Sequence, residues 1–268
     1  MNIGVIGLGV VGNAVSMGFQ KDHTVKHYDK FKIGCNTEEH FKDVAYCNVI
    51  FICVPTPMQK SGKIDLTCLH EVVAKIAEVP IQDTIIIIKS TVTIGTTDAL
   101  AKKYRHLNFA FNPEFLTNDN AVTDFQESSR IVIGAGIFVG DIIEELYTNL
   151  GFTCPIIRTN SRTAEMIKYA CNSFLAGQIT LANEINKICE WYEVDYQVVK
   201  EAAGYDERIG KNIAVPGPDG QKGFGGKCFP KDINALIQMA RESGNISYLF
   251  EEIVRTNSIY RDKEITNG

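Results

Sequence analysis

A glycine-rich turn between an apolar strand and a helix constrains this chain more than any other feature. Residues 2–6 read as a short apolar strand, and the pattern Gly-x-Gly-x-x-Gly follows at Gly7, Gly9 and Gly12. Residues 13–19 then show helical periodicity. In this context Gly7 permits the tight turn, Gly9 lets a pyrophosphate approach the backbone, and Gly12 lets helix and strand pack closely. Because phosphates favour a helix N-terminus, we predict a dinucleotide-binding unit rather than a plain glycine turn.

The end of the next strand indicates which dinucleotide binds. Residues 24–28 are expected to form that strand, and Asp29 follows it directly. An acidic residue about 20 positions after the glycines accepts hydrogen bonds from a ribose 2′-hydroxyl and repels a 2′-phosphate. Asp29 therefore favours NAD over NADP, although the cation of neighbouring Lys30 weakens that preference.

Strand and helix signals alternate from here to residue 157. Expected strands cover 49–54, 84–88, 108–111, 130–133 and 153–157, and expected helices cover 65–79, 95–104 and 139–150. The alternation is typical of a Rossmann-like, doubly wound parallel sheet, which binds ligands at the carboxyl ends of its strands. Polar residues gather at those ends: Thr56, Ser90, Thr91, Asn112 and Glu114. Each alone would be a loop or capping residue, but together they predict an active-site rim.

An all-α pattern begins at Ser161. Residues 161–192 lack proline and carry apolar residues at helical spacing, which predicts one helix about 45 Å long. Its middle, 174–182, is apolar on most faces, so we expect it to be buried between domains or subunits. We therefore predict a dinucleotide-binding domain over residues 1–160 and an all-α central domain over 161–268, joined by this long helix.

Three polar residues of that helix share one face. Glu165, Lys168 and Asn172 are spaced by three and four positions. An exposed charged stripe with an ion pair between neighbouring turns is the simpler interpretation when these residues are considered alone.

The stretch 223–232 combines glycines with a possible nucleophile. Its sequence is Gly-Phe-Gly-Gly-Lys-Cys-Phe-Pro-Lys-Asp. Pro230 suits the first turn of a helix, so Cys228 is expected at a helix N-terminus, where partial positive charge favours a thiolate. Asp232 follows one helical turn later, which makes covalent catalysis possible. The alternative is a small buried cysteine after a glycine turn.

Composition excludes several classes of protein. The chain has 268 residues and a net charge of −5, which argues against nucleic-acid or anionic-membrane binding. No apolar run approaches the roughly 18 residues that span a bilayer, and we expect no signal peptide. The eight cysteines show neither a Cys-x-x-Cys pair nor zinc-ligand spacing. We expect reduced thiols, no metal site and a cytoplasmic location.

Taken together, the motifs resemble the UDP-glucose/GDP-mannose dehydrogenase family over nearly the whole chain. The resemblance rests on six segments in the family's order: 7–12, 53–57, 90–92, 112–116, 164–172 and 223–232. It implies two-step oxidation of a sugar-nucleotide primary alcohol to the acid with two NAD, UDP-glucose being the expected substrate.

The resemblance also implies roles for individual residues. Expected catalytic residues are Cys228 as nucleophile, with Asp232, Lys168, Asn172, Glu114 and Thr91. Expected cofactor-binding residues are Gly7, Gly9, Val10, Val11, Gly12, Asp29, Lys30, Val54, Pro55, Thr56, Ser90, Thr91 and Lys231. Expected substrate-binding residues are Phe115, Leu116, Lys168, Asn172, Arg208, Phe224, Gly225 and Gly226. Arg208 resembles an arginine that reaches the neighbouring subunit's site, which with the 161–192 helix implies a homodimer.

The chain departs from the family at several points. Asn118 stands where a second glutamate is usual, and Lys227 stands where a serine or small residue is usual. A third, nucleotide-holding α/β domain has no counterpart, so the chain is either truncated or a natural short form. Two other functions stay open: a two-electron β-hydroxyacid dehydrogenase, and a catalytically silent dinucleotide-binding protein.

Overall fold

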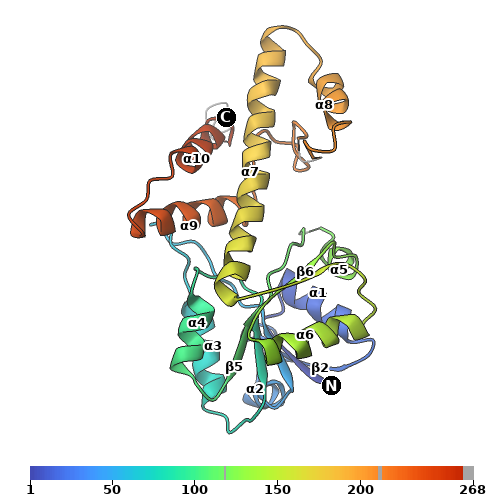
Figure 1. Cartoon of the computed structure of the whole chain (residues 1–268), viewed down its shortest axis with the longest axis vertical. Helices are drawn as coiled ribbons and strands as arrows, with labels where there is room; N and C mark the ends of the chain where they lie inside the picture. The colour runs from blue at the N-terminus through green and yellow to red at the C-terminus, as the bar shows by residue number, and fades with distance from the viewer. Residues whose placement is uncertain (118, 211–212, 262–268) are drawn as a thin grey trace. The chain divides into compact units, whose positions relative to one another are not determined.

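The computed structural model describes residues 1–117, 119–210 and 213–261, and the chain in it forms two compact units (Figure 1). The first, called the sheet unit, comprises Met1–Pro57 and Ile64–Lys168. The second, called the helical unit, comprises Met58–Lys63 and the described residues from Tyr169 on. The division after residue 160 expected from the sequence thus differs from the units, which part between Lys168 and Tyr169.

A seven-stranded sheet forms the centre of the sheet unit. Its strands are β1 (Asn2–Ile6), β2 (Thr24–Tyr28), β3 (Val49–Ile52), β4 (Ile85–Ile88), β5 (Asn108–Phe111), β6 (Ile131–Gly134) and β7 (Ile156–Thr159). Their spatial order is β2-β1-β3-β4-β5-β6-β7, and every neighbouring pair is parallel except β5–β6. The chain reverses its direction of winding between β1 and β3. Such a switch point opens a crevice at the carboxyl ends of the two strands.

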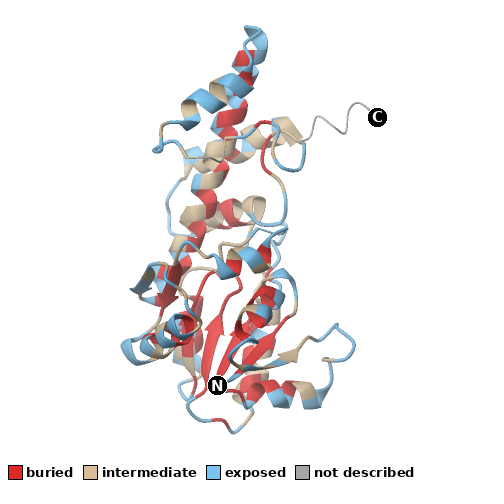
Figure 2. Cartoon of the chain, turned by 90° about the vertical axis from the view of Figure 1, so that its right-hand side faces the viewer, coloured by how far each residue is buried: buried red, intermediate tan, exposed pale blue. Residues whose placement is uncertain are grey.

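Helices cover both faces of this sheet (Figure 1). They are α1 (Val10–Phe19), α2 (Glu38–Ala45), α3 (Thr67–Ala77), α4 (Thr96–Lys103), α5 (Ala121–Gln126) and α6 (Ile137–Asn149). Successive residues of a strand point to opposite faces. In β4, accordingly, Ile86 and Ile88 join one apolar core with α2, α3 and α4, whereas Ile85 and Ile87 join another with α1, α5 and α6. The inner strands β3, β4 and β6 are therefore buried along their whole length, and buried residues are red in Figure 2, whereas the edge strands β2 and β7 are partly exposed.

The doubly wound fold agrees with the sequence prediction, and the differences are local. α2 and α5 have no counterpart among the predicted helices, although Thr37 caps α2 by accepting a hydrogen bond from the His40 N–H. The strand expected at 49–54 ends at Ile52, because Pro55 and Pro57 interrupt the extended ladder. The antiparallel direction of β6 was also not foreseen.

The helical unit is built around the longest helix, α7 (Ser161–Trp191), whose first residues lie in the sheet unit. It also contains α8 (Tyr196–Gly204), α9 (Phe229–Glu242) and α10 (Tyr248–Arg261). Ala176 of α7 packs in a small core with Phe224, Ile233 and Ile253. Within the single chain, the apolar middle of α7 is partly buried: Ala176 and Ala182 are buried, whereas Phe174 and Leu181 are 76% and 62% exposed. Among the described residues, no helix combines the length and the apolar character needed to cross a bilayer.

Candidate functional site

The surroundings of the three glycines after β1 differ, and each explains in its own way why glycine suits that position. Gly7 has φ of +89°, and a Cβ added to it would lie 2.7 Å from the carbonyl oxygen of Cys53. A Cβ on Gly12 would lie 1.8 Å from the carbonyl oxygen of Gly7, so only glycine lets α1 pack here. A Cβ on Gly9 would meet nothing within 4 Å. Gly9 is also the N-cap residue of α1, and, having no side chain, it makes no capping hydrogen bond to the N–H groups of the first turn. The loop thus leaves open space at a helix N-terminus, which suits a dinucleotide pyrophosphate.

Asp29 lies beside this loop, at the end of β2. Its Oδ2 accepts the Leu8 N–H at 2.7 Å, and its Oδ1 accepts the Phe31 N–H at 2.9 Å. Each carboxylate oxygen retains a further acceptor site, so ribose hydroxyls can still bind there. Lys30 pairs at 3.5 Å with Glu71, and both side chains are largely exposed. Sequence reasoning missed Lys32, whose Nζ donates to the Leu8 carbonyl oxygen at 2.5 Å.

The ends of β3 and β4 are tied together by a hydroxyl group. Ser90 Oγ donates to the Val54 carbonyl oxygen at 2.7 Å. Val54, Thr56 and Ser90 are buried, Thr91 is half-buried, and Pro55 is exposed. Because β1, β3 and β4 are adjacent and parallel, these residues lie at the same edge of the sheet as the glycine loop.

A buried ion pair joins the end of β5 to the start of α7. Lys168 Nζ lies 2.8 Å from Glu114 Oε1 and also donates to the Glu114 carbonyl oxygen at 2.8 Å. The Leu116 N–H donates to Glu114 Oε2 at 2.7 Å. Burial alone would raise the pKa of Glu114, but the Lys168 ammonium and these hydrogen bonds outweigh it, so the pKa lies below its ordinary value. Lys168 also lies 5.6 Å from the ring centre of Phe115.

Lys89, which the sequence analysis did not single out, is buried next to this pair. Its Nζ donates to Asn112 Oδ1 at 2.8 Å, and the Tyr147 hydroxyl donates to the same oxygen at 2.6 Å. The Asn112 amide donates to the Val132 carbonyl oxygen at 2.7 Å. Burial lowers the pKa of Lys89 to about 8. The sequence signal that could have identified Lys89 as a buried residue is its position directly after four isoleucines.

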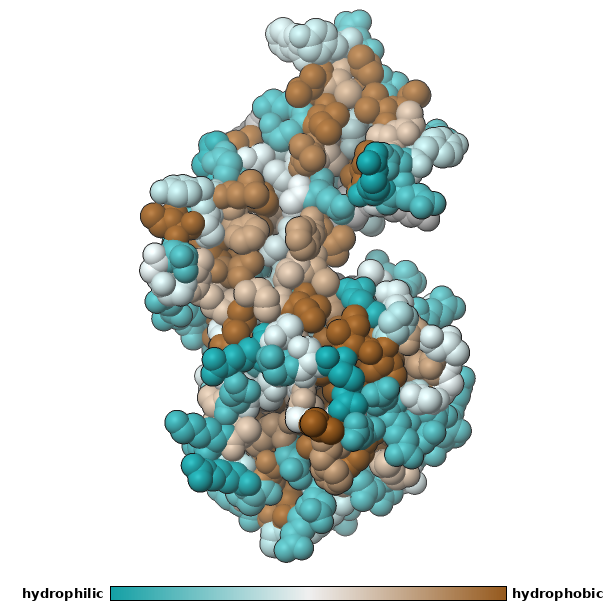
Figure 3. Space-filling view, in the orientation of Figure 1, coloured by the Kyte–Doolittle hydropathy of each residue, from teal (hydrophilic) through white to brown (hydrophobic). Residues whose placement is uncertain are grey.

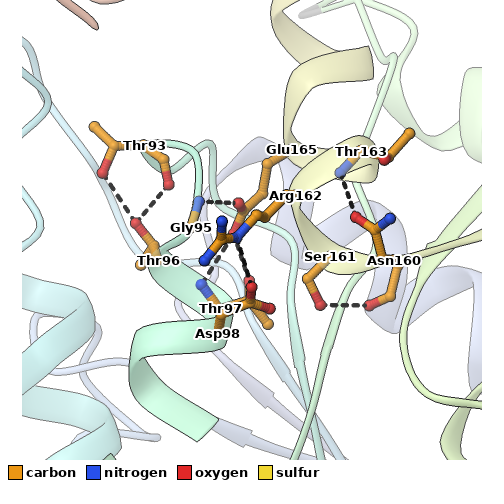
Figure 4. A network of polar contacts seen from close by, with 11 residues as sticks. Thr93, Gly95, Thr96, Thr97, Asp98, Asn160, Ser161, Arg162, Thr163 and Glu165 are labelled. Atoms are coloured by element: carbon orange, nitrogen blue, oxygen red, sulfur yellow. Dashed lines mark hydrogen bonds and ion pairs between the residues drawn. The ribbon is translucent and has the colours of Figure 1, made fainter. Parts of the chain in front are cut away.

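Glu165 anchors the first turns of α7 to the N-terminus of α4 (Figure 4). Its carboxylate accepts the N–H groups of Gly95 at 2.5 Å and Thr97 at 2.9 Å, and the Thr97 hydroxyl at 2.7 Å. Burial raises the pKa of Glu165 despite these donors. Because Glu165, Lys168 and Asn172 are all buried, the exposed-stripe interpretation of this helix face is wrong.

In the helical unit, Cys228 is the N-cap residue of α9 and is exposed, with Pro230 in the first turn, as predicted. Asp232 is fully buried, and its backbone N–H donates to the Cys228 carbonyl oxygen at 2.9 Å. The Asn172 amide donates to Asp232 Oδ2 at 2.5 Å, and Lys231 Nζ lies 2.6 Å from Asp232 Oδ1. An exposed thiol at a helix N-terminus thus lies one helical turn before a buried carboxylate that has a partner on each of its oxygens.

Two cysteines of the sheet unit have raised thiol pKa values. Burial raises the pKa of the Cys47 thiol to about 11 and that of Cys53 to about 12. Both remain protonated at neutral pH and are poor nucleophiles.

The expected substrate-binding residues are divided between the units. The sheet unit contains Phe115, Leu116 and Lys168, and the helical unit contains Asn172, Arg208, Phe224, Gly225 and Gly226. The Arg208 side chain is 89% exposed and pairs with Asp206. Phe224 is buried, and Gly226 has φ of +72°. Asn118, where the family usually has a second glutamate, lies outside the described residues.

A switch-point crevice with an open glycine loop defines a dinucleotide-binding α/β protein, and sequence comparison specifies it further. Residues 23–151 match the NAD binding domain of the UDP-glucose/GDP-mannose dehydrogenase family, and residues 162–259 match that family's central domain. The chain belongs to the UDP-glucose/GDP-mannose dehydrogenase family, and its cofactor is NAD.

Individual relatives agree with this assignment. UDP-glucose 6-dehydrogenase YwqF of Bacillus subtilis is 39% identical over 228 residues, covering 81% of this chain and 50% of that protein. The structure of a UDP-glucose dehydrogenase from the archaeon Pyrobaculum islandicum superposes with a TM-score of 0.84 at 29% identity, covering 96% of this chain and 68% of that one. The Mycobacterium tuberculosis 3-hydroxyisobutyrate dehydrogenase shares the fold, with a TM-score of 0.77 at 16% identity over 99% of this chain and 94% of that chain. The chain spans about half the length of the curated relatives it matches.

Proposed function

We propose that this chain carries out the NAD-dependent, four-electron oxidation of a sugar-nucleotide 6-hydroxyl to the carboxylate, with UDP-glucose converted to UDP-glucuronate. The observation that carries the proposal is the exposed Cys228 at the N-terminus of α9, one turn before the buried Asp232. The names of the curated relatives support UDP-glucose as the substrate. A thiol is needed for this outcome, because without one the oxidation would stop at the aldehyde.

The proposed reaction begins with proton removal by Asp232. This carboxylate, directly or through water, takes the proton of the C6 hydroxyl while the carbon loses a hydride. NAD, when bound, accepts one hydride in each of the two oxidations. The Cys228 thiolate then attacks the aldehyde carbon, and the oxygen is protonated to give a thiohemiacetal. Each oxygen of Asp232 has one partner and keeps a further acceptor site, which the hydroxyl or a bridging water molecule can use.

The second half of the reaction passes through a thioester. Loss of the second hydride and of the hydroxyl proton converts the thiohemiacetal into a thioester of Cys228. Water then attacks its carbonyl carbon, the C–S bond breaks, and the carboxylate leaves with the thiolate restored. We assign oxyanion stabilisation to Lys168 and Asn172, and orientation of water to Glu114, Thr91 and Asp232. The Lys168–Glu114 pair supports these roles, since it keeps a cation and a carboxylate in one buried place.

The remaining predicted residues are proposed to bind the two ligands. The pyrophosphate would lie on Gly9 and the N–H groups at the start of α1, with Asp29 accepting the ribose hydroxyls. The other residues proposed for NAD are Gly7, Val10, Val11, Gly12, Lys30, Val54, Pro55, Thr56, Ser90, Thr91 and Lys231. Those proposed for the sugar nucleotide are Phe115, Leu116, Lys168, Asn172, Arg208, Phe224, Gly225 and Gly226.

The decisive experiment counts NADH. The purified chain is incubated with NAD and limiting UDP-glucose, alongside Cys228→Ser and, as a matched control, Cys68→Ser on α3. Two NADH per sugar in the wild type and the control, with loss or stalling in Cys228→Ser, are the expected results. One NADH per substrate that does not depend on Cys228 would refute the thioester route.

A two-electron oxidation of a β-hydroxyacid is the alternative to test, because the 3-hydroxyisobutyrate dehydrogenase has the same fold. Turnover of small β-hydroxyacids, with none of sugar nucleotides, would favour that function. NAD binding without turnover of either substrate class would indicate a catalytically silent protein.

We further propose that the chain forms a homodimer through α7. Phe174, Leu181, Ile185 and Ile188 are exposed and follow a spacing of seven, four and three residues, which places them on one helix face. Apolar side chains gather on this part of α7 in Figure 3. Burial of this stripe against its copy removes it from water. Light scattering should give a dimer for the wild type and for Lys187→Gln, and a monomer for Leu181→Lys combined with Ile188→Lys; a dimer in the last variant would contradict this interface.

A further inference from the structure

Side chains hold the backbone at the start of the glycine-rich loop before Cys228. The Gly223 N–H donates to Asn183 Oδ1 at 2.9 Å, and the Gly223 carbonyl oxygen accepts from Arg261 at 3.0 Å. The Phe224 N–H donates to Asn257 Oδ1 at 2.7 Å, and the Phe224 carbonyl oxygen accepts from Asn257 Nδ2 at 2.9 Å. All four polar backbone groups of two consecutive residues are therefore bonded by three side chains.

Asn257 is central to this arrangement, because its carboxamide bonds both backbone groups of Phe224. It lies on α10 and is half-buried. The contact is close, since a Cβ added to Gly223 would lie 2.5 Å from Asn257 Oδ1. The Phe224 ring is buried in the core with Ile233 and Ile253. Phe224 is thus fixed through both its backbone and its side chain.

The loop beyond Phe224 is held differently. In the described part of the chain, the N–H groups of Gly225 and Gly226 take part in no hydrogen bond. Cys228 follows as the N-cap of α9. The three residues between Phe224 and Cys228 therefore span two fixed ends, and each contributes only two soft dihedral angles. The direction in which the loop N–H groups and the thiol point depends on where Phe224 is held.

We propose that Asn257 is a positioning residue for Cys228. Its carboxamide clamps the Phe224 backbone, which presents the thiol and the unbonded Gly225 and Gly226 N–H groups to the substrate in one geometry. As far as turnover is concerned, this inference rests on the proposed function. Asn257 acts through the loop rather than on a reacting atom.

The test replaces the carboxamide and follows both the loop and the reaction. Asn257→Leu keeps the side-chain size and removes both hydrogen bonds, and Asn257→Asp removes only the donor to the Phe224 carbonyl. Asn245→Leu is the control, because Asn245 is exposed and its side-chain amide donates to the Ser243 hydroxyl, outside the loop. Hydrogen exchange is measured on peptides that cover residues 221–228 and on peptides from α7, α9 and α10. Turnover and KM for NAD are measured in parallel.

We expect both Asn257 variants to exchange faster in the loop alone, with kcat lowered roughly tenfold in Asn257→Leu and KM for NAD unchanged. Three results would overturn the inference: loop exchange equal to the control, faster loop exchange with unchanged kcat, or faster exchange across all three helices with a lower melting temperature. If the wild type itself turns over no substrate, the proposed function fails. In that case hydrogen exchange still tests whether Asn257 holds the loop, because this measurement needs no substrate.

Discussion

Alanine substitutions at Gly9 and Gly12 should separate cofactor binding from folding, although these residues are only three positions apart. In Gly12→Ala the new Cβ lies 1.8 Å from the Gly7 carbonyl oxygen, and ordinary contact begins at 3.4 Å, so loop and helix must part by about 1.6 Å. Overpacking of this kind costs about 3 kcal/mol, and the better helix propensity of alanine returns about 1 kcal/mol. We expect a net loss of about 2 kcal/mol, or a melting temperature lowered by about 4–8 °C.

Gly9→Ala should behave in the opposite way. Gly9 has φ of −71°, which any residue adopts, and its new Cβ meets nothing within 4 Å. The free energy of unfolding should therefore change by less than about 0.5 kcal/mol. The methyl group projects where the pyrophosphate is expected, so NAD affinity should fall at least about tenfold, or 1.4 kcal/mol.

Calorimetry supplies both quantities: thermal unfolding of the free proteins, and titration with NAD. Wild-type NAD affinity in Gly9→Ala would refute the location of the pyrophosphate. Wild-type stability in Gly12→Ala would refute the packing argument.

Three buried charges provide further predictions. Lys168→Met leaves the Glu114 carboxylate buried without its cation, so urea unfolding should show a loss of about 3–5 kcal/mol, and adding Glu114→Gln should recover most of it; no recovery would contradict the pairing. Lys89 has a folded-state pKa of about 8, below its unfolded value of 10.5. The unfolded chain binds more protons between these values, so wild-type stability relative to Lys89→Met should rise by about 3 kcal/mol from pH 8 to 10.5, and a flat difference would refute the burial argument. Glu165→Ala deprives three donors at the start of α4 of their acceptor and should cost about 2–4 kcal/mol, whereas Glu165→Gln should cost less than half of that; equal costs would refute the capping role.

The parts of the site that sequence could predict are those with local signals. The glycine loop, Asp29 and the start of α1 lie within 30 residues, and each glycine has a separate steric reason. The N-cap position of Cys228 followed from Pro230 two residues later. In both places the residues that define the structure are neighbours in the chain, so their spacing alone predicts their arrangement.

Contacts between distant residues could not be predicted in this way. Glu165 accepts a hydrogen bond from the Thr97 N–H, 68 residues earlier in the chain. The local sequence around either residue does not indicate that the two are partners. Lys89 and Asn112 are 23 residues apart, and only Asn112 was identified as a strand-end polar residue from the sequence. The antiparallel pairing of β6 with β5 departs from the predicted parallel sheet, since a buried apolar strand has the same residue pattern in a parallel or an antiparallel ladder. Such features depend on the sheet order, which a single sequence does not reveal.

The six residues Met58–Lys63 have a consequence for how the protein is made. They belong to the helical unit, although both flanking segments belong to the sheet unit. Lys63 pairs at 2.6 Å with Glu242, which is synthesised about 180 residues later. At ~5–20 residues per second this segment waits roughly 10–40 s on the ribosome before its partner exists. The helical unit therefore cannot be completed by the continuous segment that begins at Tyr169, and no single cut in the gene separates one unit from the other.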